Sequence, residues 1–163
     1  QQLNIDHKNA QDGALIEESA ETLEITRNIA IHLTKFRGVC LVIDYGYNIE
    51  SAERSRNQYS STLQAIKHHQ YHPIFESLGE SDLSAHVDFN TLKNAALQKG
   101  IKNVSIFSQR DFLVNWGIII RQQLLKSKSL PKEAVILDAQ LHRLISKEQM
   151  GEIFKAMEYS FFG

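Results

Sequence analysis

Apolar residues recur along this chain in two patterns, one helical and one extended. Steps of three and four residues place apolar side chains on one face of a helix. With candidate caps at their ends, they predict four long helices: from Ser19 to Gly38, from Asp88 to Gly100, Asp111–Lys126, and from Pro131 through Leu144. Continuous apolar runs and β-branched residues predict three strands, Val39–Ile43, Ile101–Phe107 and Ile153–Phe161.

The run Val39–Ile43 decides the fold class. Every residue in it is apolar, and it stops at Asp44-Tyr45-Gly46. A strand that is apolar on both faces is typical of a parallel sheet covered by helices on each side. Because a predicted helix directly precedes the strand, the pair forms half of a βαβ unit. We therefore expect an α/β fold.

The remaining stretches carry weaker patterns. Residues 1–13 are polar and aperiodic, which indicates a tail, a loop or a short edge strand. Tyr47–Ser60 is also polar and predicts an exposed loop. The spacing in Thr62–Gln70 favours a short helix, and Tyr71–Ala85 is expected to be irregular.

Length and charge narrow the classes of protein that remain. At 163 residues, with 42% hydrophobic and 23% charged residues, the chain has the size and composition of one soluble globular domain. A net charge of −1 gives no basic excess for nucleic acid or an acidic membrane. No apolar run approaches the roughly 18–20 residues of a membrane span. The first residue is not methionine, so we expect a processed chain or a piece of a longer protein.

Two acidic segments lie where an open α/β sheet binds its ligands, beyond the carboxyl ends of the strands. One is Asp44-Tyr45-Gly46, directly after the first strand, and the other contains Asp82, His86 and Asp88. A purely structural interpretation stays open for both segments, because Asp88 is a good N-cap and Asp44 suits the start of a turn.

Histidine and cysteine give less support for chemistry. His68 and His72 stand four residues apart and would share a helix face, where His86 could add a third zinc ligand. However, Pro73 disfavours helical geometry at His72, and a solvated polar face explains the same residues. Cys40 lies inside the predicted strand and is expected to pack in the core. As the single cysteine, it forms no internal disulfide, which fits a reducing compartment.

Several short strings follow one another in the order found in one enzyme family. They are Leu41–Gly46, Thr62–Ala65 with His69, Gly79–Phe89, Gln109 with Phe112-Leu113 and Gly117-Ile118, and Met150–Lys155. Together they resemble the MidA family of S-adenosylmethionine-dependent methyltransferases, which includes the mitochondrial arginine methyltransferase that assists complex I assembly. The resemblance covers nearly the whole chain, and its most specific part is Gly79–Phe89.

The resemblance implies a partial class I, Rossmann-like methyltransferase fold and S-adenosylmethionine as the cofactor of the full-length enzyme. Val39–Ile43 would be the fifth strand of the class I sheet, and the two later strands would be the last, one of them antiparallel. Family members are longer, and their N-terminal half carries a glycine-rich cofactor loop that this sequence lacks. Residues 1–163 are therefore expected to be the C-terminal part of the domain, inactive without an N-terminal half.

Methyl transfer also suggests roles for the acidic segments. It is an in-line displacement, so the enzyme mainly aligns the acceptor with the sulfonium. If the acceptor is a protein arginine, carboxylates are needed to orient its guanidinium. We predict that Asp82 and Asp88, with His86 as a further candidate, flank the acceptor, and that Asp44-Tyr45-Gly46 forms the pocket floor. No residue is assigned to the cofactor or to a metal.

A non-catalytic alternative stays open. An incomplete sheet would leave the edge at Val39–Ile43 exposed, and exposed edges pair with other chains. The chain could then be an assembly module that forms a homodimer. In either case we expect a protein partner, with no nucleic acid or membrane. The expected location is the cytoplasm of a bacterium, or the mitochondrial matrix if the source is eukaryotic.

Overall fold

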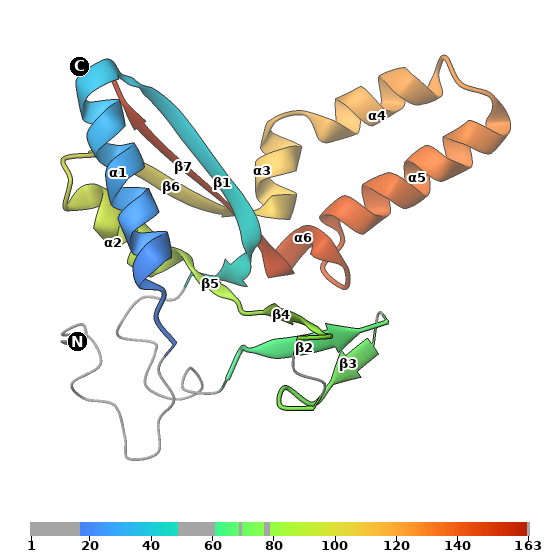
Figure 1. Ribbon diagram of the computed structural model, residues 1–163. Helices are drawn as coiled ribbons and strands as arrows, with labels where there is room; N and C mark the ends of the chain where they lie inside the picture. Colours follow the sequence, from blue (N-terminus) through green and yellow to red (C-terminus); the bar gives the residue numbers. More distant parts are fainter. Residues whose placement is uncertain (1–16, 49–60, 69, 77–78, 163) are drawn as a thin grey trace.

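The computed structural model describes residues 17–48, 61–68, 70–76 and 79–162. The predicted tail at 1–13 and most of the predicted loop Tyr47–Ser60 lie outside these residues. The described part forms a four-stranded sheet, a smaller three-stranded sheet next to it, and a pair of helices that projects away from both (Figure 1).

Helix α1, Ala20–Phe36, begins and ends close to the predicted residues. The Ser19 side chain accepts a hydrogen bond from the Thr22 backbone N–H at 3.3 Å, which confirms Ser19 as the N-cap. At the other end Arg37 takes a φ of 64°, and its N–H donates to the Leu33 carbonyl. One face of the helix buries Thr26, Ala30 and Leu33.

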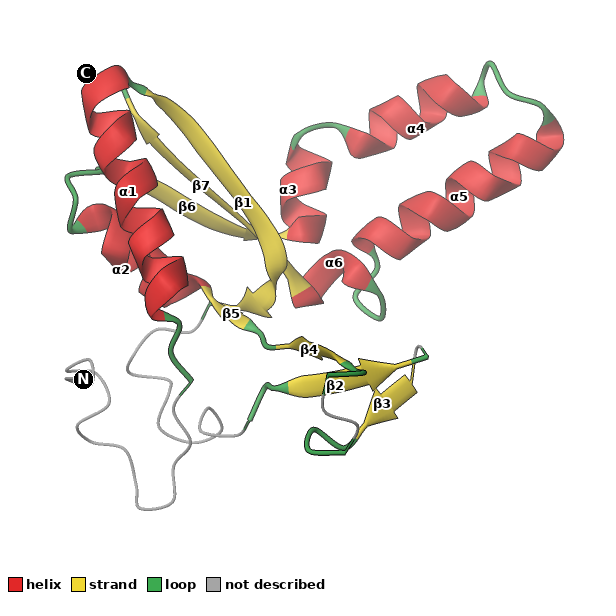
Figure 2. Cartoon of the chain, viewed as in Figure 1, coloured by secondary structure: helices red, strands yellow, loops and turns green. Residues whose placement is uncertain are grey.

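The main sheet has the strand order β5-β1-β7-β6. Its strands are β1 Gly38–Tyr47, β5 Val87–Asp88, β6 Asn103–Ser108 and β7 Phe154–Phe161. Strand β7 runs antiparallel to both of its neighbours, β1 and β6, whereas β5 pairs in parallel with the end of β1 (Figure 2). The predicted α/β class and the single antiparallel strand among the last two are therefore confirmed.

Helices cover one face of this sheet. Helix α1 and helix α2, Phe89–Leu97, pack side by side against it, and the core beneath them holds Phe89, Met157 and Tyr159 as its largest fully buried side chains. Alternate residues of β1 point into this core. The residues between them, Val39, Leu41 and Ile43, are 52%, 45% and 48% exposed. In the described part of the chain α1 and α2 cover the other face of β1, so the predicted burial of β1 on both faces is wrong there.

The smaller sheet was not predicted. Its strands, β2 Gln64–Lys67, β3 Gln70–His72 and β4 Asp82–Ser84, pair antiparallel in the order β3-β2-β4. The predicted helix over Thr62–Gln70 is wrong. The described part of Tyr71–Ala85 is mostly irregular, with turns and bends, as predicted, but it also holds the end of β3 and all of β4. The turn falls at His68, which takes a φ of 53°. Ala65 is buried and pairs with Leu83, a long-range contact that local spacing does not reveal.

Helices connect β6 to β7 through a long excursion. They are α3 Gln109–Asn115, α4 Ile118–Lys126, α5 Pro131–Ile145 and α6 Met150–Ile153. Helices α4 and α5 lie side by side and project from the sheet (Figure 1), joined by an ion pair of 2.6 Å between Lys126 and Asp138. The single helix predicted over Asp111–Lys126 is divided at Gly117, whose φ is 82°. No described helix is long and apolar enough to cross a membrane.

Candidate functional site

A pocket lies where the start of α1, the end of β1 and the segment before α2 meet. Its volume is about 560 Å³. It lies at the carboxyl end of β1, the edge at which open α/β sheets bind their ligands. The polar side chains that line it include Glu17, Glu18, Arg27, Tyr47, His86 and Asp88.

Asp88 lines this pocket and caps α2 with the same carboxylate. Its Oδ1 accepts hydrogen bonds from the backbone N–H groups of Asn90 and Thr91, at 3.1 and 3.2 Å. Its Oδ2 accepts a bond of 2.7 Å from the Thr91 hydroxyl. The predicted cap is confirmed, and these bonds fix the direction in which the carboxylate of the predicted site residue points.

Glu17 joins the start of α1 to the chain that enters β2. Its carboxylate accepts hydrogen bonds from the Thr62 backbone N–H at 2.8 Å and from the Thr62 hydroxyl at 2.5 Å. The Leu63 N–H and the Ser61 hydroxyl add two more, both at 3.2 Å. The Thr62 hydroxyl oxygen in turn accepts the backbone N–H of His86 at 2.9 Å. One hydroxyl therefore links two residues of the pocket lining.

These bonds make the Glu17 contribution depend on pH. Burial acts to raise the pKa of the Glu17 carboxyl, but the bonds from Thr62, Leu63 and Ser61 outweigh it, and the pKa lies below its ordinary value of 4.5. A carboxyl whose folded pKa is lowered stabilises the fold above its unfolded pKa. That stabilisation is lost as the pH falls through the folded value.

We therefore expect Glu17→Gln to lower the free energy of unfolding most near neutral pH. The difference from the parent chain should shrink as the pH falls below 4.5. Urea unfolding of both proteins across this range measures it. Glu24→Gln, a change at an exposed position of α1, is the control and should show no such trend. A difference that stays constant with pH would contradict the assignment.

Asp44, Tyr45 and Gly46, the predicted pocket floor, are not part of the pocket lining, but Tyr45 and Gly46 contact residues that are. The Tyr45 ring packs edge to face against the His86 ring, with 5.7 Å between centroids, and against Phe154 at the same separation. Gly46 pairs with Val87 so closely that a Cβ at Gly46 would lie 2.1 Å from the Val87 carbonyl oxygen. The Asp44 Oδ1 accepts the Tyr45 N–H at 2.8 Å. Tyr45 therefore packs against one residue of the pocket lining, His86, and Gly46 packs against another, Val87.

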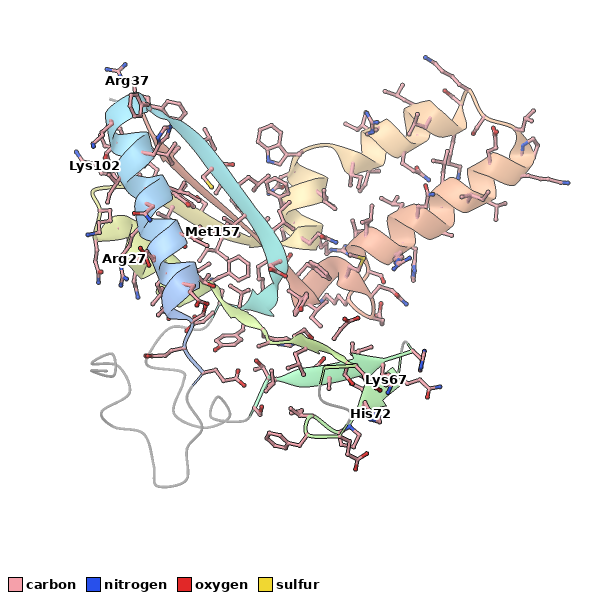
Figure 3. All side chains as sticks on the ribbon, in the orientation of Figure 1. Arg27, Arg37, Lys67, His72, Lys102 and Met157 are labelled. Carbon is pink, nitrogen blue, oxygen red and sulfur yellow. The ribbon has the colours of Figure 1, made fainter. Side chains whose placement is uncertain are left out.

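Asp82 lies apart from the pocket. It is exposed in β4, where it pairs with Ile66. His72 is in β3 of the same small sheet, and Figure 3 shows it well separated from Arg27 on α1. His68 and His72 are therefore not on a shared helix face. Within the described ranges, no three His, Cys, Asp or Glu side chains could hold a metal ion together.

Cys40 packs against the core, as predicted. It lies on β1 opposite Tyr159 of β7, whose side chain is almost completely buried. Burial raises the pKa of the Tyr159 hydroxyl, and the neighbouring Cys40 thiol adds to the shift. The pair therefore belongs to the packed interior of the sheet.

Three residues at this site, Glu17, Glu18 and Thr62, were not predicted from the sequence. Glu17 and Glu18 stand before the cap of α1, where acidic residues are ordinary. Thr62 stands 45 residues away from Glu17 in sequence. Thr62 reaches Glu17 through contact between the segment before α1 and the segment that enters β2, and the sheet that β2 belongs to was not expected.

With this geometry in place, comparison with known proteins gives the family. A model of the family described as "Putative S-adenosyl-L-methionine-dependent methyltransferase" matches residues 1–107. The chain belongs to this family. The resemblance to the MidA methyltransferases is thereby confirmed.

Curated relatives of this methyltransferase-family chain are longer than it is. The protein arginine methyltransferase NDUFAF7, mitochondrial, of Danio rerio is 33% identical over 140 residues, which make up 86% of this chain and 31% of that protein. The protein of the same name from Homo sapiens is 29% identical over 143 residues, 87% of this chain and 28% of its own length. The chain spans about three tenths of the length of these relatives.

Two solved structures from Burkholderia thailandensis share the fold of this family member. One, of an uncharacterized protein, has a TM-score of 0.74 and 26% identity, over 92% of this chain and 41% of that one. The other contains S-adenosyl-homocysteine and has a TM-score of 0.70 and 28% identity, over 85% of this chain and 35% of that one. These matches support the predicted partial Rossmann-like fold.

Proposed function

We propose that this chain forms the acceptor side of an S-adenosylmethionine-dependent methyltransferase and that its pocket binds the guanidinium of a protein arginine. The observation that carries the proposal is the acidic lining of the pocket at the end of β1. Glu17, Glu18 and Asp88 supply three carboxylates there, against one guanidinium from Arg27. The curated relatives are named protein arginine methyltransferases, which agrees with such an acceptor.

The cofactor itself does not fit this chain. The resemblance to the family implies that a glycine-rich loop holds the cofactor, and this sequence contains no such loop between a strand and a helix. We therefore assign the chain the binding and orientation of the acceptor only, and infer that it is inactive alone. Calorimetry should detect no binding of S-adenosylmethionine to this chain, and tight binding would contradict the assignment.

The residues of the pocket suit the tasks that an arginine acceptor sets. A guanidinium offers five N–H donors in a flat fork, which carboxylates bind with two parallel hydrogen bonds. Asp88 is held in one direction by its bonds to α2. Its Oδ1 already accepts two of them, so Oδ2 is the oxygen that would accept an N–H of the guanidinium. His86, held by Tyr45, lies on the same wall and can accept the proton that a guanidinium nitrogen loses on methylation.

Acceptor binding can be tested on the chain as it is. Titration with a short arginine peptide should give measurable binding, and the same peptide with citrulline should not bind. Citrulline has nearly the same shape but carries no charge, so the comparison isolates the interaction with the carboxylates. Equal affinity for the two peptides would refute the proposed acceptor site.

Asp88→Asn separates the two functions of Asp88. Asparagine caps a helix about as well as aspartate does, so the free energy of unfolding should change by less than about 0.5 kcal/mol. Affinity for the arginine peptide should fall roughly tenfold, because a bond to a charged carboxylate is lost. Asp88→Ala should weaken binding and also cost about 1 kcal/mol of stability. Asp138→Asn, on α5, controls for the loss of one charge elsewhere.

Asp82 has a separate place in the proposal. It is exposed on β4, and β4 leads through Ala85 into the wall of the pocket. We infer that Asp82 contacts the acceptor protein beside the modified residue rather than the guanidinium itself. Asp82→Asn should then weaken binding of a peptide with a second basic residue, and leave a peptide with one arginine unaffected.

A second candidate is a non-catalytic assembly module that dimerises through β1. In the described residues, the edge of β1 away from β7 pairs with β5 only at Gly46 and Tyr47. The edge from Gly38 to Tyr45 therefore offers backbone groups to another strand. Light scattering at high concentration should then give a dimer, and Leu41→Lys should return it to a monomer. A strict monomer of the parent chain would rule out this candidate.

A further inference from the structure

The Thr62 hydroxyl occupies a central position beneath the pocket. Thr62 enters the small sheet, Glu17 precedes α1, and His86 lies between β4 and β5. The hydroxyl donates to Glu17 Oε2 at 2.5 Å and accepts the His86 N–H at 2.9 Å. A single O–H group therefore holds together three segments that are 24 and 45 residues apart in sequence.

The two residues that Thr62 holds are both part of the pocket lining. Glu17 receives its shortest bond from this hydroxyl, so the direction of its carboxylate depends on Thr62. His86 is fixed twice, at its backbone by Thr62 and at its ring by Tyr45. Without the bond to Thr62, the His86 N–H would lose this acceptor, although the next residue, Val87, stays paired with Gly46.

We propose that Thr62 is a positioning residue, which sets the places of Glu17 and His86 in the acceptor pocket without touching the acceptor. The proposal rests on the proposed function, since it assumes that this pocket receives the guanidinium. The proposal also assigns a role to the small sheet, whose strand β2 begins just after Thr62. The sheet anchors the segment of Thr62 and thereby determines where the wall of the pocket stands.

A threonine methyl and hydroxyl are nearly the same size, so Thr62→Val removes both hydrogen bonds and changes the shape little. Thr62→Ser keeps the hydroxyl and removes only the methyl group. If Thr62 acts through its hydrogen bonds, Thr62→Val should change the His86 amide exchange and the peptide affinity, and Thr62→Ser should keep both near the parent values. If it acts only by filling space, valine should be the milder change. The pair of variants therefore separates positioning from packing.

The first measurement is amide hydrogen exchange by NMR on the chain itself. In Thr62→Val the His86 amide should exchange at least about tenfold faster, because it loses its acceptor. The chemical shifts of the His86 ring protons should also change, because the ring packs against Tyr45. In Thr62→Ser both should stay near the parent values. Thr34→Val makes the same chemical change at a bond to the Ile31 carbonyl on α1, and it should leave His86 unchanged.

The second measurement is titration with the arginine peptide below the unfolding transition. The dissociation constant should rise about tenfold in Thr62→Val and return close to the parent value in Thr62→Ser. A lower unfolding midpoint in Thr62→Val, with His86 exchange and peptide affinity both unchanged, would overturn the proposal. If the parent chain binds no arginine peptide, the proposed function fails, and His86 exchange still decides whether Thr62 positions the residue.

Thr62→Cys is the fallback if Thr62→Val does not fold. Its thiol is a weaker donor and acceptor on the same carbon, so His86 exchange should fall between the values of the parent and a chain without the bond. Exchange at the parent rate in Thr62→Cys, together with parent affinity for the peptide, would also overturn the proposal.

Discussion

Replacing Gly46 with alanine is expected to destabilise the chain by at least about 3 kcal/mol, because the added methyl group has no room. A Cβ at this position would lie 2.1 Å from the Val87 carbonyl oxygen and 2.9 Å from two further backbone atoms of Val87. A side chain could rotate away from such a contact, but a backbone cannot. The parallel pairing of β1 with β5 would have to open, and the wall of the pocket would move with it.

Urea unfolding followed by circular dichroism measures this effect. Gly117→Ala is a suitable control, because that glycine takes a φ of 82° but has nothing within 4 Å of a built Cβ. It should cost only about 1–2 kcal/mol, the strain of a left-handed residue. Equal losses in the two variants would mean that close approach to Val87 is not what requires glycine at position 46.

Phe89→Ala is expected to remove about 3–5 kcal/mol of stability, which is the usual range for deleting a buried aromatic side chain. Phe89 is completely buried and belongs to the core cluster beneath α1 and α2, with Leu33 and Met157. The residue also follows the cap Asp88 directly. Loss of its packing should therefore loosen the start of α2 together with the core.

The matched control is Phe75→Ala, since Phe75 is 85% exposed. That change should alter the free energy of unfolding by no more than about 0.5 kcal/mol. The two variants lose the same atoms, so the difference between their unfolding midpoints reports burial alone. Equal losses of unfolding free energy in Phe89→Ala and Phe75→Ala would contradict the burial of Phe89 in the core.

The features that the sequence predicted correctly are mostly those with local causes. Ser19 and Asp88 cap their helices through bonds to residues two and three positions away, so the signal lies in a short window. Pro131 begins α5 for a similar reason. The strand at Ile153–Phe161 was also predicted from its own residues, but the antiparallel direction of one of the last two strands followed only from the resemblance to a family.

The errors have long-range causes. Thr62–Gln70 has the spacing of a short helix, yet Ala65 pairs with His72 on one side and with Leu83 on the other. Such pairing depends on tertiary contacts that override local propensity. Burial of β1 on both faces was also inferred from its residues alone, and Val39, Leu41 and Ile43 instead lie on the face away from α1.

Some of the residues named from the sequence lie at the pocket, and others do not. Asp88 and His86 line the pocket, and Tyr45 and Gly46 support its wall, because all four belong to segments at the carboxyl end of the sheet. Asp82 stands outside that lining in β4. Glu17 lies before α1, and its place in the pocket depends on its hydrogen bonds to Thr62, which the sequence does not predict.

The position of β7 has a consequence for how this protein is made. It lies between β1 and β6, yet it is synthesised after both of them. During synthesis, the edges of β1 and β6 that pair with β7 stay unpaired until residues 154–161 have left the ribosome. Such late, long-range pairing slows folding and leaves strands open to wrong partners in the meantime. A nascent chain stalled before Phe154 should therefore need protection by a chaperone.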